Sequence, residues 1–231
     1  MQNSTRTTPN IPIIYEDNHL LVIDKPEGVL SQEDRTNDSD VLTLCKIYIK
    51  KKYNKPGDAY LGLVHRLDQP VSGLMVLAKT SKAASRLSEQ LRNGALKSAY
   101  WALVEGRTPM EGTLTHYLSK DNKTNFVRAF NSKKSGTKPA TLKFETIKQS
   151  SNHSLVEVDL ITGRPHQIRV QMAKIEFPLW GDYKYGEKGI KPGRRLGLRS
   201  VKLTFIHPTT KKKMEFIVNP PKQQPWSFFD Y

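Results

Sequence analysis

Cysteine and long apolar runs are almost absent from this sequence. Cys45 is the only cysteine in 231 residues, which excludes an internal disulfide framework or a cysteine-based zinc site and favours a reducing compartment. No segment approaches the roughly 20 consecutive apolar residues that a membrane-spanning helix needs. The N-terminus also lacks the apolar segment of a secretory signal. We therefore expect no membrane association and a cytoplasmic location.

Motifs for bound nucleotides and metals are missing as well. The sequence contains no glycine-rich phosphate-binding loop. No two of its six histidines have the spacing of metal ligands. These absences argue against chemistry that depends on a nucleotide or a metal ion.

Acidic residues are few compared with basic ones. The chain has 37 Lys and Arg against 22 Asp and Glu, a formal net charge of +15. Because self-repulsion opposes compaction, this excess indicates a polyanionic partner, and nucleic acid fits best. An anionic membrane surface would instead predict one basic amphipathic helix or tail. The basic residues recur along the chain, at Lys50 to Lys52, Lys133-Lys134, Lys188 to Arg199 and Lys211 to Lys213.

The apolar pattern predicts a strand-rich chain with three helices. Helices and strands do not alternate strictly, so we expect an α+β protein whose mixed, mainly antiparallel sheet is flanked by a few helices. Helices are expected over 41–53, 82–93 and 165–175. Strands are expected over 11–15, 20–24, 61–64, 74–78, 97–105, 113–119, 125–130, 140–148, 154–161, 200–206 and 213–218.

The first two helices carry recognisable end signals. Asp40 is the expected N-cap of the first, and Cys45 is expected to pack in the core as a small apolar group. Ser81 is the expected cap of the second, and Gly94 lies where a C-terminal cap would. The apolar stripe of the second helix is predicted to contain Ala84, Leu87 and Leu91.

One domain is expected over residues 11–220, because the sequence shows no internal repeat and no clear linker. Residues 1–10 are polar, with one arginine and no acid, and are predicted to form a disordered tail. Prolines end the regular pattern near residue 220, so residues 221–231 are predicted to form a C-terminal tail.

His65-Arg66-Leu67-Asp68 is the most informative segment. It lies between two apolar runs and is followed by a turn signal at residues 69–73. The pattern predicts a loop that presents the Asp68 carboxylate between two strands, a common position for catalytic groups. Taken alone, Asp68 could equally be a turn-capping carboxylate before a proline.

A second block, Thr162 to Arg169, follows a predicted strand and opens the third helix. Pro165 suits the first turn of that helix, and His166 and Arg169 would lie within one turn of each other. A helix N-terminus rich in arginine and backbone N–H groups can bind an anion. Without other information, a solvated basic helix start is the simpler interpretation.

Two further blocks lie on predicted strands. Tyr100 has apolar neighbours, so its ring is either core or, beside a nucleic-acid site, a surface on which a base stacks for about 1–3 kcal/mol. The segment from Leu198 to Pro208 is most simply a core strand.

These four blocks and the opening segment IIYEDNHLLVIDKPEGV resemble, in order and approximate spacing, the RluA family of RNA pseudouridine synthases. The segment GLVHRLDQPVSGLMVLAKT is similar to the catalytic loop of that family, and the resemblance runs from about Ile11 to about Pro220. It implies a single pseudouridine-synthase-type catalytic domain. It also implies an isomerase that breaks the N1–C1′ bond of specific uridines in structured ribosomal or transfer RNA and forms C5–C1′, with no cofactor or metal.

The resemblance also implies roles for individual residues. Asp68 would be the essential carboxylate, Tyr100 would pack on the target base, and Arg169 would pair with Asp68 to hold it ionised and oriented. Arg66 would enter the RNA stack vacated by the uridine. Val71 departs from the family, which often has Thr or Ser there, and we expect little effect. The other expected RNA-contacting or apolar wall residues are His65, Arg164, His166, Leu198 and Leu203, although for His166 a structural hydrogen bond is equally compatible.

Alternatives remain open at this point. A non-catalytic RNA-binding protein could retain the fold, although it would not need Asp68, Tyr100 and Arg169 together. A base-excision enzyme would need a second carboxylate or an activated water, and the sequence offers no obvious partner for Asp68. Attack on C1′, addition to the uracil ring and proton abstraction from C2′ are all compatible with one carboxylate. Only about ten residues precede the first expected strand, so we expect the catalytic domain and its basic loops to select the site, in a monomer without an obligatory protein partner.

Overall fold

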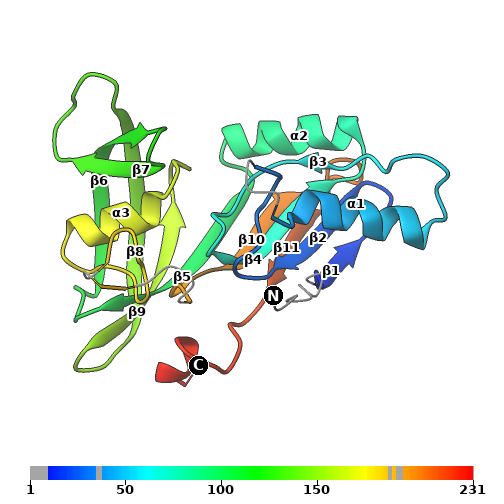
Figure 1. Ribbon diagram of the computed structural model, residues 1–231. Coiled ribbons are helices and arrows are strands. Elements are labelled where there is room, and N and C mark those ends of the chain that lie inside the picture. Colours follow the sequence, from blue (N-terminus) through cyan, green and yellow to red (C-terminus); the bar gives the residue numbers. More distant parts are fainter. Residues whose placement is uncertain (1–9, 35–37, 187–188, 191–194, 231) are drawn as a thin grey trace, which may run out of the picture.

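One mixed sheet of 11 strands organises the part of the chain that the computed structural model describes, residues 10–34, 38–186, 189–190 and 195–230 (Figure 1). Residues 1–9 of the expected polar tail and much of the basic run from Lys188 to Arg199 lie outside these residues. The strand order is β1-β2-β4-β10-β5-β9-β8-β6-β7, with β3 paired to β4 and β11 paired to β10. The predicted α+β class and mixed sheet are confirmed.

The strands match the predicted ranges to within a few residues, because short apolar runs and alternating apolar residues are both local signals. Their bounds are β1 Ile13–Glu16, β2 Leu20–Lys25, β3 Gly62–Leu63, β4 Ser72–Ala78, β5 Lys97–Glu105, β6 Glu111–Asp121, β7 Phe126–Phe130, β8 Lys138–Gln149, β9 His153–Leu160, β10 Leu198–Ile206 and β11 Lys213–Ile217.

The pairing of β4 with β10 is parallel, whereas the other strand pairs of the described chain are antiparallel. Ser72 lies opposite Arg199, and Gly73 lies opposite Ser200. Gly73 has φ +115, and a Cβ there would collide with the backbone of Ser200. Glycine is therefore required where the chain leaves the Asp68 loop and enters the centre of the sheet.

Helix α1, Val41–Lys52, begins as predicted. The Asp40 side chain accepts a hydrogen bond from the Thr43 amide at 3.0 Å. Cys45 is fully buried, as expected of a small apolar group in the core.

Helix α2, Ser81–Arg92, differs from the prediction at its N-cap. The cap is Thr80 rather than Ser81, because Thr80 keeps an extended backbone and its hydroxyl accepts from the Ala83 amide at 3.1 Å. Its buried residues are Ala83 and Leu87, while Leu91 is exposed. Gly94 follows the helix with φ +76, the conformation predicted for a C-terminal cap.

Helix α3, Gln167–Lys174, begins later than predicted, and Pro165 precedes it instead of forming its first turn. The Gln167 side chain accepts hydrogen bonds from the Arg164 amide and the Thr162 hydroxyl, both at 2.9 Å. This turn keeps the residues before Gln167 out of the helix. His166 is the N-cap residue, with φ +53 in the left-handed region.

Two apolar clusters make up most of the core. The first apolar cluster joins α1 and α3 to the sheet, and the second joins α2 to the sheet. Because successive strand residues point to opposite faces, Leu21 and Ile23 of β2 belong to the first cluster, and Leu20 and Val22 belong to the second. In Figure 1, α1 and α2 lie at the end of the sheet with β1 and β2, and α3 lies at the end with β6, β7 and β8.

The residues after Pro220 fold back against the sheet. They form a 3-10 helix, Trp226–Phe228, and Trp226 packs with Leu103, Leu155 and Trp180. Within the described residues, no helix is both long enough and apolar enough to cross a membrane.

Candidate active site

The Asp68 loop connects β3 to β4 and is fixed by the segment after β2. The Ser31 hydroxyl accepts from the Leu67 amide at 3.1 Å and donates to the Leu67 carbonyl at 2.7 Å. The Asp68 carbonyl accepts from the Val71 amide at 3.0 Å and closes the turn before β4. The backbone is thus held on both sides of Asp68, whose side chain stays 29% exposed.

A buried lysine supports the other side of this loop. Lys25 is fully buried, and its Nζ donates to the Gln69 carbonyl at 3.1 Å and to the Pro26 carbonyl at 3.0 Å. Burial lowers the pKa of Lys25 to about 7, although the charges of Asp68 and Glu27 oppose the change. The sequence showed only a pattern break after β2, and nothing in that pattern indicated that Lys25 would be buried beneath the Asp68 loop.

Arg169 contacts two carboxylates unequally. Its Nε and Nη2 donate to the two oxygens of Asp182, both at 2.7 Å, whereas its Nη1 lies 3.5 Å from Asp68 Oδ2. Arg169 is 2% exposed and Asp182 is fully buried. Burial opposes the charge of Arg169, but the Asp182 hydrogen bonds outweigh this and raise its pKa. The structure therefore brings Arg169 to Asp68, as expected, and gives Arg169 a stronger partner that sequence reasoning missed.

His166 also faces Asp68. Its Nε2 lies 3.8 Å from Asp68 Oδ2, and its Nδ1 lies 2.6 Å from the Tyr185 hydroxyl. Burial lowers the pKa of His166. The charges of Arg169 and Lys184 also lower it, whereas the charge of Asp68 raises it. The Tyr185 ring centroid lies 5.2 Å from Arg169 Cζ. Tyr185 was not among the expected site residues, because nothing in its local pattern distinguishes it from a core tyrosine.

Tyr100 lies on β5 and belongs to the first apolar cluster, together with Leu67, Leu198 and Ile168. It is 8% exposed. Burial and the nearby Asp68 charge raise the pKa of Tyr100 to about 12, so the phenol is neutral at ordinary pH. An uncharged aromatic ring thus lies beside the carboxylate.

Three other residues that were predicted to contact RNA differ in their exposure and hydrogen bonds. Arg66 is exposed and makes no hydrogen bond or ion pair that involves a described residue. Arg164 donates from Nε to the Pro139 carbonyl at 3.1 Å. His65 accepts from the Val76 amide at 3.1 Å, and burial lowers its pKa to about 4, so the neutral ring is tied to β4.

Leu198 and Leu203 lie in different parts of the core. Leu198 belongs to the first apolar cluster, which also holds Tyr100. Leu203 is fully buried in the second cluster, among residues of α2 and the other face of the sheet. The expectation that Leu203 forms a wall of the site is therefore wrong, because alternation along β10 directs its side chain to the opposite face.

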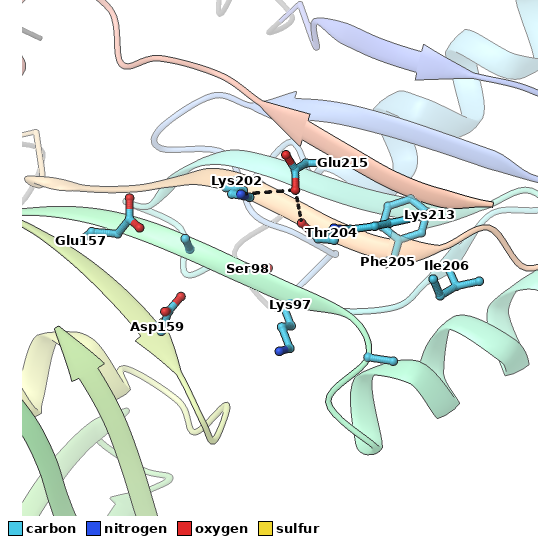
Figure 2. A pocket seen from close by; sticks show the side chains of 12 residues that line it. Lys97, Ser98, Glu157, Asp159, Lys202, Thr204, Phe205, Ile206, Lys213 and Glu215 are labelled. Carbon is cyan, nitrogen blue, oxygen red and sulfur yellow. Dashed lines mark hydrogen bonds and ion pairs between the residues drawn. The ribbon is translucent and has the colours of Figure 1, made fainter. Parts of the chain in front are cut away.

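A hollow of about 490 Å³ lies elsewhere on the sheet, across β5, β9, β10 and β11 (Figure 2). Lys97 and Asp159 line it, together with the ion pair of Lys202 and Glu215 at 3.3 Å. Charges of both signs do not match a polyanion, and none of the residues around Asp68 lines this hollow. Over the described ranges, no three acidic, histidine or cysteine side chains are grouped closely enough to hold a metal ion.

Comparison with known proteins identifies the family of this chain. The family model described as RNA pseudouridylate synthase matches residues 19–174, which include Asp68, Tyr100 and Arg169. An uncharacterised RNA pseudouridine synthase of Mycoplasma genitalium is 35% identical over 210 residues, covering 89% of this chain and 65% of that protein. This chain thus spans about 65% of the length of that relative.

Two further comparisons concern a named enzyme and a solved structure. The ribosomal large subunit pseudouridine synthase D of Zymomonas mobilis is 32% identical over 222 residues, covering 92% of this chain and 70% of that protein. The structure of human RNA pseudouridylate synthase domain containing 4 superposes with a TM-score of 0.76 at 21% identity, covering 91% of this chain and 89% of that one. The second likeness concerns the fold alone.

Proposed function

We propose, since this chain belongs to the RNA pseudouridylate synthase family, that it isomerises specific uridines in structured RNA to pseudouridine. The reaction breaks the N1–C1′ bond and forms the C5–C1′ bond. C5 gives up its proton to water and N1 takes one up, so the product is an isomer of uridine. The observation that carries the proposal is the single carboxylate of Asp68, held on a pinned loop beside buried Arg169 and the neutral ring of Tyr100.

Asp68 acts as the essential carboxylate in this proposal. It could attack C1′, add to the uracil ring, or take a proton from C2′. Each route needs only one carboxylate, because no water has to be activated, whereas hydrolysis usually needs a second acid or base. Asp182 is not available as that second group, since both of its oxygens accept hydrogen bonds from Arg169.

Tyr100 and Arg169 shape the site around Asp68. Tyr100 packs against the flat face of the target base, and its raised pKa keeps the phenol uncharged during contact. Arg169 orients the Asp68 carboxylate through Nη1, while Asp182 fixes the guanidinium. A charge-assisted fork of this kind has a defined geometry, so the position of Nη1 is set before the substrate arrives.

RNA binding draws on the basic surface. The target uridine must leave its stack to reach Asp68, at a cost of a few kcal/mol. Contacts between RNA phosphates and the lysine and arginine side chains, which give the chain a net charge of +15, offset part of this cost. Arg66 is exposed two residues before Asp68, where its guanidinium can enter the stack in place of the uridine. Arg164 and His166, at the start of α3, are the further RNA contacts we propose, and Leu198 supplies an apolar wall.

Ribosomal RNA is the substrate class that we favour, because the Zymomonas mobilis relative is named for the ribosomal large subunit. We further propose that the protein acts as a monomer in the cytoplasm, where that RNA is found.

Product analysis tests the proposal. Unmodified ribosomal and transfer RNA would be incubated with the protein, digested to nucleosides and separated by chromatography. We expect pseudouridine to form without free uracil. Free uracil would indicate base excision, and salt-dependent binding without any new nucleoside would indicate an RNA-binding protein that retains the fold.

A further inference from the structure

The Tyr185 hydroxyl lies between a backbone amide and the ring of His166. It accepts from the Val127 amide of β7 at 2.9 Å and lies 2.6 Å from His166 Nδ1. The Tyr185 ring also contacts Phe126, with centroids 4.8 Å apart, and lies 5.2 Å from Arg169 Cζ. The hydroxyl is therefore fixed by neighbours on both sides.

We propose that Tyr185 is a positioning residue that sets the tautomer of His166, so that the Nε2–H of His166 faces Asp68. The hydrogen-bond donors and acceptors around the ring determine where its proton lies. A backbone amide can only donate, so the Tyr185 oxygen accepts from Val127. Among the described residues, His166 Nδ1 is the one atom that can accept the hydroxyl proton, so the hydroxyl donates to His166. In a neutral imidazole, Nδ1 must then accept, and the ring proton lies on Nε2.

The surroundings of His166 and Tyr185 favour the protonation states that these hydrogen bonds require. Burial lowers the pKa of His166, which favours the neutral ring. Burial raises the pKa of Tyr185 to about 12, so its hydroxyl retains the proton that it donates. The pattern of hydrogen-bond donors and acceptors around the ring therefore assigns its tautomer.

The tautomer of His166 determines whether a donor or a lone pair faces one oxygen of Asp68. His166 Nε2 lies 3.8 Å from Oδ2, the same oxygen that Arg169 Nη1 approaches at 3.5 Å. The Arg169 distance is at the limit of a hydrogen bond and the His166 distance lies beyond it, and catalytic hydrogen bonds often tighten in the substrate complex. The other tautomer would turn the lone pair of Nε2 toward a carboxylate oxygen, which is repulsive. Because two donors face Oδ2, Oδ1 is the oxygen presented to the uridine.

The backbone is consistent with a functional constraint on His166. Its φ of +53 is uncommon for a residue other than glycine, and the Gln167 turn holds it there. Lys184, next to Tyr185, adds a second tie to the β6–β7 turn by donating to the Asn125 carbonyl at 2.9 Å. The tautomer is thus set by elements on both sides of the site.

The proposal rests on the proposed function only for its effect on turnover, because the tautomer can be measured without RNA. Nitrogen-15 spectra of the imidazole rings would be recorded for the wild type and for Tyr185→Phe. The His166 signals would be assigned by their loss in His166→Gln. We expect the Nε2–H pattern in the wild type and a mixture of tautomers in Tyr185→Phe.

Turnover supplies the second arm. Loss of one positioning hydrogen bond predicts about a tenfold fall in kcat for Tyr185→Phe, with KM little changed. His166→Gln keeps an N–H near the Nε2 position, so it should retain more activity than His166→Ala. In the His166→Gln background, Tyr185→Phe should lower kcat much less than it does in the wild type. Tyr183→Phe is the matched control, because the Tyr183 ring also lies near Arg169, at 6.0 Å, and should change neither spectrum nor kcat.

Two results would overturn the proposal. One is an Nδ1–H pattern for His166 in the wild type. The other is a folded Tyr185→Phe protein, shown by an unchanged thermal midpoint, with unchanged tautomer and kcat. If Tyr185→Phe does not fold, the wild-type spectrum still decides. If the wild type forms no pseudouridine, the proposed function fails, while the spectra still decide the tautomer.

Discussion

At the scale of single residues, Arg169 depends on Asp182 for its position. The two side chains are almost inaccessible and share a bidentate pair at 2.7 Å. Removing one partner of such a pair leaves a buried charge without compensation. The position of Arg169 relative to Asp68 therefore depends on the Arg169–Asp182 pair.

Asp182→Ala should lower the free energy of unfolding by about 3–5 kcal/mol. Urea denaturation would measure it, with Arg169→Met and the double variant completing a cycle. The double variant should be more stable than the sum of the single losses predicts, because it removes the isolated charge. A loss below about 1 kcal/mol for Asp182→Ala would contradict this account of the pair.

Lys25 gives a residue-scale prediction about pH. Its pKa is about 7 in the folded protein, against the ordinary value of 10.5 that applies to the unfolded chain. Between these values the unfolded chain binds more protons at Lys25 than the folded protein does, so this residue makes stability rise with pH. Lys25→Met should remove that contribution. Urea midpoints from pH 7 to pH 10 would show a smaller rise for Lys25→Met than for the wild type.

The exposed Lys82 supplies the control for this comparison. Lys82→Met should leave the wild-type dependence on pH unchanged. A parallel pH dependence in Lys25→Met and the wild type would show that the buried lysine is not the source.

At the scale of elements, Glu16 ties β1 to α1 and β4. Its carboxylate accepts from Lys52 at 2.6 Å, Lys79 and Tyr53 at 2.7 Å, and Tyr48 at 2.9 Å. Burial alone would raise the pKa of Glu16, but these hydrogen bonds outweigh it and lower the pKa to about 2. One side chain thus joins a strand to the helix above it and to the residue that follows β4.

This depressed pKa predicts acid sensitivity. Below its ordinary value of 4.5 the unfolded chain takes up a proton at Glu16 that the folded protein binds only near 2, so the contribution to stability is lost as pH falls through this window. Glu16→Gln should be less stable than the wild type at pH 7, and the gap should narrow between pH 4.5 and pH 2. Chemical denaturation across this range measures it, and a constant gap would count against the network.

The elements themselves were largely predictable, and their ends were not. The strand Lys138–Gln149, predicted over 140–148, has buried and more exposed side chains in alternation along most of its length, which is a local signal. The N-cap at Thr80 and the late start of α3 depend on which side chain captures a free amide, as Gln167 does for Arg164. That competition is decided by backbone geometry, which residue order alone does not show. Which strands become neighbours in the sheet, as the parallel pair β4 and β10 do, also depends on long-range packing.

At the scale of the whole molecule, the sheet and α3 bring together groups that are far apart in sequence. Asp68 and Arg169 are 101 residues apart, and Tyr100 lies between them on β5. The resemblance to a known family indicated these three residues. Lys25, Asp182 and Tyr185 were missed, because a buried polar side chain has no periodic signature and its partners become visible only in the fold.

In the proposed reaction, the Asp68 carboxylate drives isomerisation of uridine. RNA labelled with tritium at uridine C5 tests it directly, because forming the C5–C1′ bond expels that tritium into water. We expect release by the wild type and by Asp58→Asn, the same change at a fully exposed carboxylate. Asp68→Asn should bind the RNA and release no tritium. Release by Asp68→Asn at the wild-type rate, or equal loss of binding and turnover, would contradict the account.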